Sequence, residues 1–144
     1  MTVLETNIDD LNPQVFSYVI DKLLKNGASD AFLKTVLMKK GRFGFLLTVV
    51  CKDSLKERML DIIFSETTSF GIKINNTEHA CLEREIKKVK TRYGMIRVNV
   101  GKWKGKVKTI SLEYDDCRKI AKKNNIPLKN VLQSLKVPIS SRHR

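Results

Sequence analysis

Polar side chains crowd one short stretch near the start of the chain. Residues 5–10 read Glu-Thr-Asn-Ile-Asp-Asp, so five of these six side chains are polar. Thr6, Asn7, Asp9 and Asp10 could offer oxygen ligands to a divalent cation, because Mg²⁺ is typically held by one or two carboxylates together with phosphate oxygens. The alternative is that Asp9 and Asp10 only complement the dipole of the helix that follows. Both interpretations remain open on these residues alone.

A second cluster combines basic side chains with glycines. Residues 39–44 contain Lys39, Lys40 and Arg42 together with Gly41 and Gly44. Ammonium and guanidinium groups bind phosphate, and glycine lets backbone amides approach a phosphate closely. The segment is therefore either a phosphate-binding loop or an ordinary solvated hairpin loop.

A third segment, residues 66–71, is rich in hydroxyl groups. Glu66 is followed by Thr67, Thr68 and Ser69. Hydroxyls at the start of a strand can bind phosphate or ribose, but Ser and Thr also fill ordinary turns. The segment gains weight only together with the other two, because several connections of one fold can lie near one another.

The basic segment also suggests a rival function. Residues 41–47, which follow Lys40, resemble the aromatic-rich RNA-binding strand of the RRM, a βαββαβ fold that carries this motif on its third strand. The match is imperfect, because Arg42 disturbs the spacing and because Thr6 and Asn7 stand where the first RRM strand has a stacking aromatic. An RRM-like module that binds single-stranded RNA is the alternative hypothesis.

Other catalytic classes lack the residues that they need. The histidines are His79 and His143, and the sequence contains no recognisable Ser-His-Asp or Cys-His set and no GxxxxGK[ST] loop. The three cysteines are widely spaced, which predicts reduced thiols rather than a disulfide framework or a zinc site. His79 and Cys81 alone are too few for a closed metal site. If the chain is an enzyme, a metal and a nucleotide must supply much of the chemistry.

Residues 1–78 are predicted to form a ferredoxin-like unit. Their periodicity indicates the order β-α-β-β-α-β, which is the split βαβ arrangement of that fold. The expected strands are residues 2–8, 31–38, 45–51 and 70–74.

Two helices are expected in this unit. The first is capped by Asn12, has Pro13 at its first helical position and stops before Gly27. The second is opened by a capping box of Ser54 and Glu57 and ends near residue 65.

Residues 79–138 are predicted to form a basic antiparallel β-sheet followed by two helices. Ile96, Val98 and Val100 alternate with polar residues, which is typical of a sheet with one buried and one solvated face. The fold class is thus α+β, with residues 139–144 as a disordered basic tail. The remaining expected elements are strands over residues 82–90, 95–100 and 106–110, a helix over residues 115–123 and a helix from residue 127.

The net charge of +13 is carried by one part of the chain. Up to residue 78, ten acidic residues balance ten basic ones, and the residues that follow contain 18 basic and 5 acidic side chains. A field of one sign attracts polyanions or an acidic partner surface. No apolar run approaches the length of a membrane span, and the start lacks the regions of a signal peptide, so a cytoplasmic protein that does not bind membranes is expected.

Five segments of the chain, taken in order, resemble one family. They are residues 5–13, residues 38–42, residues 66–71, the Thr-Arg-Tyr-Gly run at 91–94 and the Glu-Tyr-Asp-Asp-Cys run at 113–117. In this order and spacing they resemble the C-terminal half of the LarC family, the nickel-insertion proteins for the nickel-pincer nucleotide cofactor of lactate racemase. Five ordered matches are far more specific than any one of them.

The resemblance implies an enzyme, a CTP-dependent nickel chelatase of the lyase class. Such an enzyme inserts Ni²⁺ into pyridinium-3,5-bisthiocarboxylic acid mononucleotide while CTP is cleaved to CMP and pyrophosphate. This half would bind CTP with Mg²⁺ or Mn²⁺ and would assemble into a homo-oligomer, either a trimer or a hexamer. Nucleic acid is not an expected partner on this interpretation.

The resemblance also implies roles for particular residues, although it identifies neither a catalytic residue nor a nickel ligand. The residues that would bind CTP or its phosphates are Lys39, Lys40, Arg42, Thr67, Thr68 and Arg92. The residues that would line the nucleotide or divalent-metal site are Thr6, Asn7, Asp9, Asp10 and Glu66.

Two departures from the family pattern limit what the resemblance carries over. Leu112 replaces the usual proline before the Glu-Tyr-Asp motif, which affects local backbone geometry more than function. The N-terminal half of the family, which is His-rich and associated with nickel, does not match any part of this sequence. That half is expected as a partner, on the same protein or on a separate chain, and this chain would bind CTP without inserting nickel unaided. A third hypothesis is a scaffold that only recruits another subunit.

Overall fold

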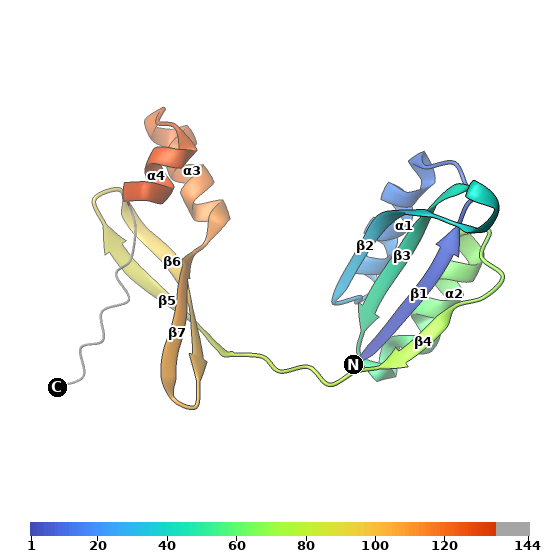
Figure 1. The fold of residues 1–144 in the computed structure, drawn as a ribbon. Coiled ribbons are helices and arrows are strands. Elements are labelled where there is room, and N and C mark those ends of the chain that lie inside the picture. Colours follow the sequence, from blue (N-terminus) through green and yellow to red (C-terminus); the bar gives the residue numbers. More distant parts are fainter. Residues whose placement is uncertain (135–144) are drawn as a thin grey trace. The chain divides into compact units, whose positions relative to one another are not determined.

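The computed structural model describes residues 1–134 of the chain. The described part divides into two compact units, one of residues Met1–His79 and one that begins at Ala80 (Figure 1). Each unit has its own antiparallel sheet and its own helices, so the predicted α+β fold class is confirmed. None of the helices in the described part has the length and apolar character needed to cross a bilayer. The tail expected at residues 139–144 lies outside the described residues.

The N-terminal unit is a four-stranded antiparallel sheet with two helices. Its strands lie in the order β2-β3-β1-β4, and each neighbouring pair is antiparallel. This order, with a helix in each of the two crossover connections, is the ferredoxin-like βαββαβ topology predicted from the sequence. The elements are β1 (Thr2–Ile8), α1 (Gln14–Lys25), β2 (Asp30–Leu37), β3 (Phe43–Cys51), α2 (Lys56–Glu66) and β4 (Lys73–Asn76).

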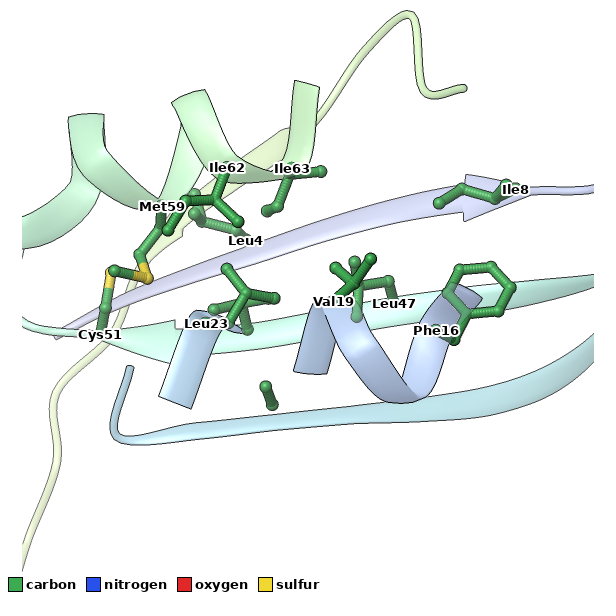
Figure 2. Packing of buried hydrophobic residues seen from close by; sticks show 12 residues of the cluster. Leu4, Ile8, Phe16, Val19, Leu23, Leu47, Cys51, Met59, Ile62 and Ile63 are labelled. Atoms are coloured by element: carbon green, nitrogen blue, oxygen red, sulfur yellow. The ribbon is translucent and has the colours of Figure 1, made fainter. Parts of the chain in front are cut away.

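The core of this unit lies between the sheet and its two helices (Figure 2). Phe16 and Leu23 from α1 and Met59 from α2 are at most 1% exposed, and they pack on Leu4 and Leu47 of the two central strands. Each such side chain contributes roughly 1.5–3 kcal/mol when it is fully buried. The core therefore fixes the positions of both central strands, and with them the loops at the strand ends.

The start of α1 agrees with the sequence prediction. Pro13 has helical dihedral angles of φ −55° and ψ −27°, and the backbone N–H of Gln14 donates to Asn12 Oδ1 at 3.0 Å. Asn12 thus caps the helix, and Pro13 occupies its first turn, where no N–H is needed. Gly27 follows the helix with φ +101°, a left-handed conformation that glycine adopts without strain.

The start of α2 differs from the prediction, because the capping box of Ser54 and Glu57 is not formed. A single 3₁₀ turn (Asp53–Leu55) precedes α2, and no side chain caps either element. The Thr2 hydroxyl instead donates to the Asp53 carboxylate at 2.7 Å, and the amino terminus lies 3.4 Å from the same carboxylate. These contacts hold Asp53, in the β3–α2 connection, against the start of the chain.

The last strand of the unit begins later than predicted. β4 starts at Lys73, opposite Glu5, whereas the strand was expected over residues 70–74. Phe70 is fully exposed and lies before the strand. The preceding residues do not join the ladder, because Ser69 Oγ and the Gly71 carbonyl hydrogen-bond to the Thr6 side chain of β1.

The C-terminal unit is a three-stranded antiparallel sheet with helices on one face. Ile96, Val98 and Val100 are 1–5% exposed and pack against Cys117 and Ile120. The predicted alternation of a buried and a solvated face is therefore confirmed. The strands lie in the order β5 (Glu83–Thr91), β6 (Gly94–Trp103) and β7 (Lys106–Leu112), and the helices are α3 (Tyr114–Asn124) and α4 (Leu128–Ser134).

Candidate functional site

Three connections of the N-terminal unit meet at one end of its sheet (Figure 1). β1 and β2 both run antiparallel to β3, so these two strands stop at the same end of the sheet. β4 runs antiparallel to β1 and therefore begins at that end. The connections are residues 9–13 after β1, residues 38–42 after β2 and residues 67–72 before β4. Each connection overlaps one of the polar or basic clusters of the sequence, which are residues 5–10, 39–44 and 66–71.

An ion pair joins the first connection to the second. Arg42 Nε lies 3.0 Å from Asp9 Oδ2, and the Asp9 side chain is 16% exposed whereas that of Arg42 is 57% exposed. The buried Oδ2 atom accepts no hydrogen bond from the described residues. The contact between Asp9 and Arg42 is therefore an ion pair in which the N–H bond of Nε does not point at the oxygen. Asp9 is thus a nearly buried carboxylate with unused acceptor capacity beside a guanidinium that reaches solvent.

Gly44 allows the second connection to approach the first this closely. A Cβ atom at Gly44 would lie 2.8 Å from the backbone oxygen of Ile8 and 2.6 Å from Met38 Sδ. Neither distance is possible for a real side chain, so only glycine fits here. Gly44 was expected to let backbone amides approach a phosphate, and in the structure it also permits the close spacing of β1 and β3 at the site.

Hydroxyl groups join the third connection to β1. Thr68 Oγ1 donates to Asp10 Oδ1, which links residues 58 positions apart. Thr6 is 4% exposed, and its Oγ1 atom donates to the Gly71 carbonyl oxygen at 2.9 Å and hydrogen-bonds with Ser69 Oγ. Thr6 and Thr68 therefore hold the hydroxyl-rich loop against the acidic end of β1.

The two lysines of the basic segment are exposed. Lys39 and Lys40 lie in a single 3₁₀ turn (Lys39–Gly41), which is closed by a hydrogen bond from Met38 N to Arg42 O at 2.8 Å. Lys40 has φ +63°, an uncommon conformation for a residue other than glycine. No hydrogen bond or ion pair in the described part of the chain engages either ammonium group. Both are therefore available to an anionic ligand.

Two of the predicted site residues are engaged elsewhere in this unit. Glu66 forms an ion pair with Lys22 of α1, and this hydrogen bond raises the pKa of the lysine. Thr67 Oγ1 donates to the Ile63 carbonyl at 2.7 Å and so closes the end of α2. Lys22 could not be predicted as the partner of Glu66, since nothing in the sequence pairs two residues that are 44 positions apart on different helices.

The other two predicted residues lie away from this cluster. Asn7 is exposed and alternates with the buried Thr6 and Ile8, so it lies on the sheet face opposite the helices. Arg92 belongs to the C-terminal unit, at the β5–β6 turn, where its guanidinium lies 4.7 Å from the centre of the Tyr93 ring.

The acidic residues suit a cation that arrives with a nucleotide. Within residues 1–134, no group of three or more His, Cys, Asp or Glu side chains is placed to hold a metal ion. Asp9 and Asp10 supply two carboxylates, and Asp9 Oδ2 has no hydrogen bond. Because Mg²⁺ is usually bound by one or two carboxylates plus phosphate oxygens, this pair fits a metal–phosphate complex.

The acidic motif at residues 113–117 joins α3 to β6 in the C-terminal unit. Arg97 donates from Nε and Nη2 to the two carboxylate oxygens of Asp116 at 2.9 and 2.7 Å. The Arg97 backbone N–H donates to the same carboxylate at 3.0 Å, and together these bonds hold the pKa of Asp116 well below its usual range. Asn99 Nδ2 donates to Glu113 Oε2 at 3.2 Å. The motif thus has a structural role within this unit.

The RNA-binding hypothesis lacks the aromatic platform that it needs. In an RRM, aromatic side chains on the solvated faces of the first and third strands stack on bases. Here Phe45 of β3 packs into the core, with its ring centre 5.1 Å from that of Phe16. The alternating positions of β1 and β3 that face away from the helices include Glu5, Leu46 and Thr48, and none of these is aromatic.

Comparison with known proteins gives one consistent family. A family model described as nickel insertion protein matches residues 1–132. A putative nickel insertion protein of Dictyoglomus thermophilum is 47% identical over 130 residues, covering 90% of this chain and 33% of the relative. A pyridinium-3,5-bisthiocarboxylic acid mononucleotide nickel insertion protein of Acetivibrio thermocellus is 45% identical over 133 residues, covering 92% and 32%. The chain spans about a third of the length of these relatives.

Solved structures agree with this result. The C-terminal domain of a cyclometallase involved in the synthesis of the NPN cofactor of lactate racemase, in its apo form, superposes with a TM-score of 0.86. It is 32% identical, and the match covers 92% of this chain and 91% of that one. A protein of Methanopyrus kandleri superposes with a TM-score of 0.71 at 24% identity, covering 92% and 81% of the two chains, which shows a shared fold.

Proposed function

The chain belongs to the nickel insertion protein family, and from that membership we propose that it is the CTP-binding part of a nickel chelatase. The complete enzyme would insert Ni²⁺ into pyridinium-3,5-bisthiocarboxylic acid mononucleotide and so form the nickel-pincer cofactor of lactate racemase. CTP would be cleaved to CMP and pyrophosphate in the course of this reaction, and the nickel chelatase itself would belong to the lyase class. Ni²⁺ is a substrate of this reaction.

The observation that carries the proposal is the meeting of three connections at one end of the N-terminal sheet. They bring the guanidinium of Arg42 to 3.0 Å from the Asp9 carboxylate, in a turn that also carries Lys39 and Lys40. Asp10, the next residue, is held by the Thr68 hydroxyl of the third connection. A nucleoside triphosphate with a divalent cation carries both charge signs, and a site with adjacent cations and carboxylates matches that distribution.

Each group at this end would have a separate task. Lys39, Lys40 and Arg42 would bind the phosphate oxygens, and Arg42 would exchange part of its contact with Asp9 for contact with phosphate. Asp9 and Asp10 would hold Mg²⁺ or Mn²⁺, which when bound would neutralise charge on the triphosphate. Thr6, Thr68 and Ser69 would keep the loop in place through the hydrogen bonds described above.

We propose further partners for this part of the enzyme. Nickel would be delivered by a His-rich N-terminal half, on the same protein or on a separate chain, since the curated relatives are about three times as long as the matched region. The protein would work in the cytoplasm as a homo-oligomer, a trimer or a hexamer, as its resemblance to the family implies. CTP and the pyridinium mononucleotide would be its small-molecule ligands.

Calorimetric titration with four nucleotides tests this function. CTP in the presence of Mg²⁺ or Mn²⁺ is expected to bind at least about tenfold more tightly than ATP, GTP or UTP, which corresponds to about 1.4 kcal/mol. Addition of EDTA should weaken CTP binding strongly, because the two carboxylates would then face the triphosphate without a cation. Equal affinities for all four nucleotides would exclude a CTP-dependent enzyme.

A further inference from the structure

The C-terminal unit has a pocket of its own on the sheet face opposite its helices. The pocket has a volume of about 250 Å³. Asn99 and Gly101 alternate along β6 with Val98 and Val100, which face the core, so the pocket lies on the solvated face. It is lined by Leu82, Arg84, Asn99, Gly101, Thr109 and Ser111.

The absence of a side chain at Gly101 creates the floor of this pocket. Gly101 lies opposite Arg84 on β5 and Thr109 on β7. A Cβ atom at Gly101 would lie 2.7 Å from both Leu82 Cδ1 and Thr109 Cγ2. Any side chain at this position would therefore push apart two residues that line the pocket.

A chain of hydrogen bonds fixes the guanidinium of Arg84 at the pocket. Arg84 Nε and Nη2 both donate to Asn99 Oδ1, at 3.0 and 2.7 Å. Asn99 in turn donates to Glu113 Oε2 at 3.2 Å, which fixes the orientation of its amide. Within residues 1–134, no hydrogen bond or ion pair uses the other N–H groups of Arg84. The guanidinium is thus held in place with donors to spare, which lowers the entropy cost of binding an anion.

The donors around the pocket match a phosphate monoester. Arg84 supplies a planar fork of N–H groups, and Thr109 and Ser111 supply one hydroxyl each. A phosphate monoester offers three strong acceptor oxygens, one more than a carboxylate. Leu82 adds an apolar wall against which the carbon skeleton of the ligand can pack. The solvated face also carries Lys88, so its field favours an anion.

We propose that this pocket binds the phosphate group of a mononucleotide-sized phosphate monoester. The volume suits a phosphate and the adjoining sugar, and it is too small for a dinucleotide. The pocket belongs to the C-terminal unit, whereas the residues proposed for CTP lie in the N-terminal unit, apart from Arg92. Failure of either proposal therefore leaves the other intact.

Nuclear magnetic resonance titration of the full chain with ribose 5-phosphate tests the pocket directly. At physiological salt, saturable shifts are expected at the backbone amides of Gly101, Thr109 and Ser111. Inorganic phosphate should give the same pattern more weakly, because it lacks the carbon skeleton that Leu82 would contact. Ribose without phosphate should give no shift at these amides. If ribose 5-phosphate gives no saturable shift at these residues, the proposed site does not exist.

Two variants that remove the same charge show whether binding depends on the pocket itself or only on the positive charge of this face. Arg84→Met is expected to weaken ribose 5-phosphate binding by about tenfold or more, since a charge-assisted contact contributes about 1.5–3 kcal/mol. Lys88→Met removes the same charge from the same face of β5, outside the pocket, and should change affinity less than about twofold. Equal losses in the two variants would overturn the proposal.

A second pocket variant tests the proposal even if Arg84→Met proves to be misfolded. Thr109 is exposed, and Thr109→Val replaces only its hydroxyl by a methyl group of similar size, so the fold should persist. It is expected to weaken binding about threefold or more while the amide shifts of Val98 and Val100 in the free protein stay unchanged. Unchanged affinity in Thr109→Val would contradict the assignment of the hydroxyl as a phosphate ligand.

Discussion

Replacing Lys39 and Arg42 together with alanine is expected to weaken CTP binding by about a hundredfold or more. Each side chain would donate a charge-assisted hydrogen bond to a phosphate, and such a bond contributes about 1.5–3 kcal/mol. Since about 1.4 kcal/mol corresponds to a factor of ten, two such bonds exceed a factor of one hundred. Calorimetric titration with CTP and Mg²⁺ measures the loss.

The control for this double variant carries the same charge change elsewhere in the unit. Lys52→Ala with Arg58→Ala removes one lysine and one arginine that are exposed, one directly after β3 and one in α2. This variant should bind CTP within about twofold of the parent, because distant exposed charges are screened by salt. Thermal unfolding of both variants checks that each is folded. Equal losses in the two variants would show that bulk charge, and not the basic turn, binds the nucleotide.

Gly44→Ala is expected to damage both the fold and CTP binding. The new Cβ atom would lie 2.8 Å from the Ile8 carbonyl oxygen, which belongs to the backbone of β1 and cannot rotate away. Overpacking of this kind costs about 1–3 kcal/mol, and relief would move the turn that carries Lys39 and Arg42. Urea unfolding should show the lost stability, and CTP titration of the folded fraction should show lower affinity.

Gly71→Ala is the matched control for this substitution. No atom lies within 4 Å of a Cβ built at Gly71, and its backbone φ angle is ordinary. Its stability is expected to remain within about 0.5 kcal/mol of the parent, as for other exposed substitutions. If Gly44→Ala were as stable as Gly71→Ala, the close approach of the two connections would not be a structural requirement.

Local chemistry made the helices and the strand faces predictable. Asn12 and Pro13 mark the start of α1 through one side-chain acceptor and one missing N–H, which need no tertiary contact. Ile96 and Val98 alternate with polar residues, and this period of two identifies a half-buried strand. The order of such elements was sufficient to predict the ferredoxin-like topology of the first unit.

Long-range contacts decided the features that were predicted wrongly. Ser54 does not cap α2, and its neighbour Asp53 is engaged by Thr2, which lies 51 positions earlier in the sequence. β4 begins at Lys73 because the preceding residues hydrogen-bond to Thr6 instead of joining the ladder. These partners are more than 50 positions apart, so patterns within a short window could not reveal them.

The sequence predicted which segments form the candidate site, but not which side chains contact one another there. The sequence placed polar and basic clusters in three connections, and the topology brings these connections to one edge. The sequence did not reveal that Asp9 pairs with Arg42 inside the site, whereas Glu66 pairs with Lys22 outside it. Ion pairs of this kind depend on which side chains happen to face one another across packed elements.

Backbone amide shifts recorded on the full chain show where on the protein CTP binds. With CTP and Mg²⁺, saturable shifts are expected at the amides of residues 9–12, 38–42 and 67–71, because all three connections would surround the nucleotide. The amides at the opposite end of the same sheet, at Lys52 and Asp53, should not move. Shifts confined to the basic C-terminal unit, with none in the three connections, would contradict the account.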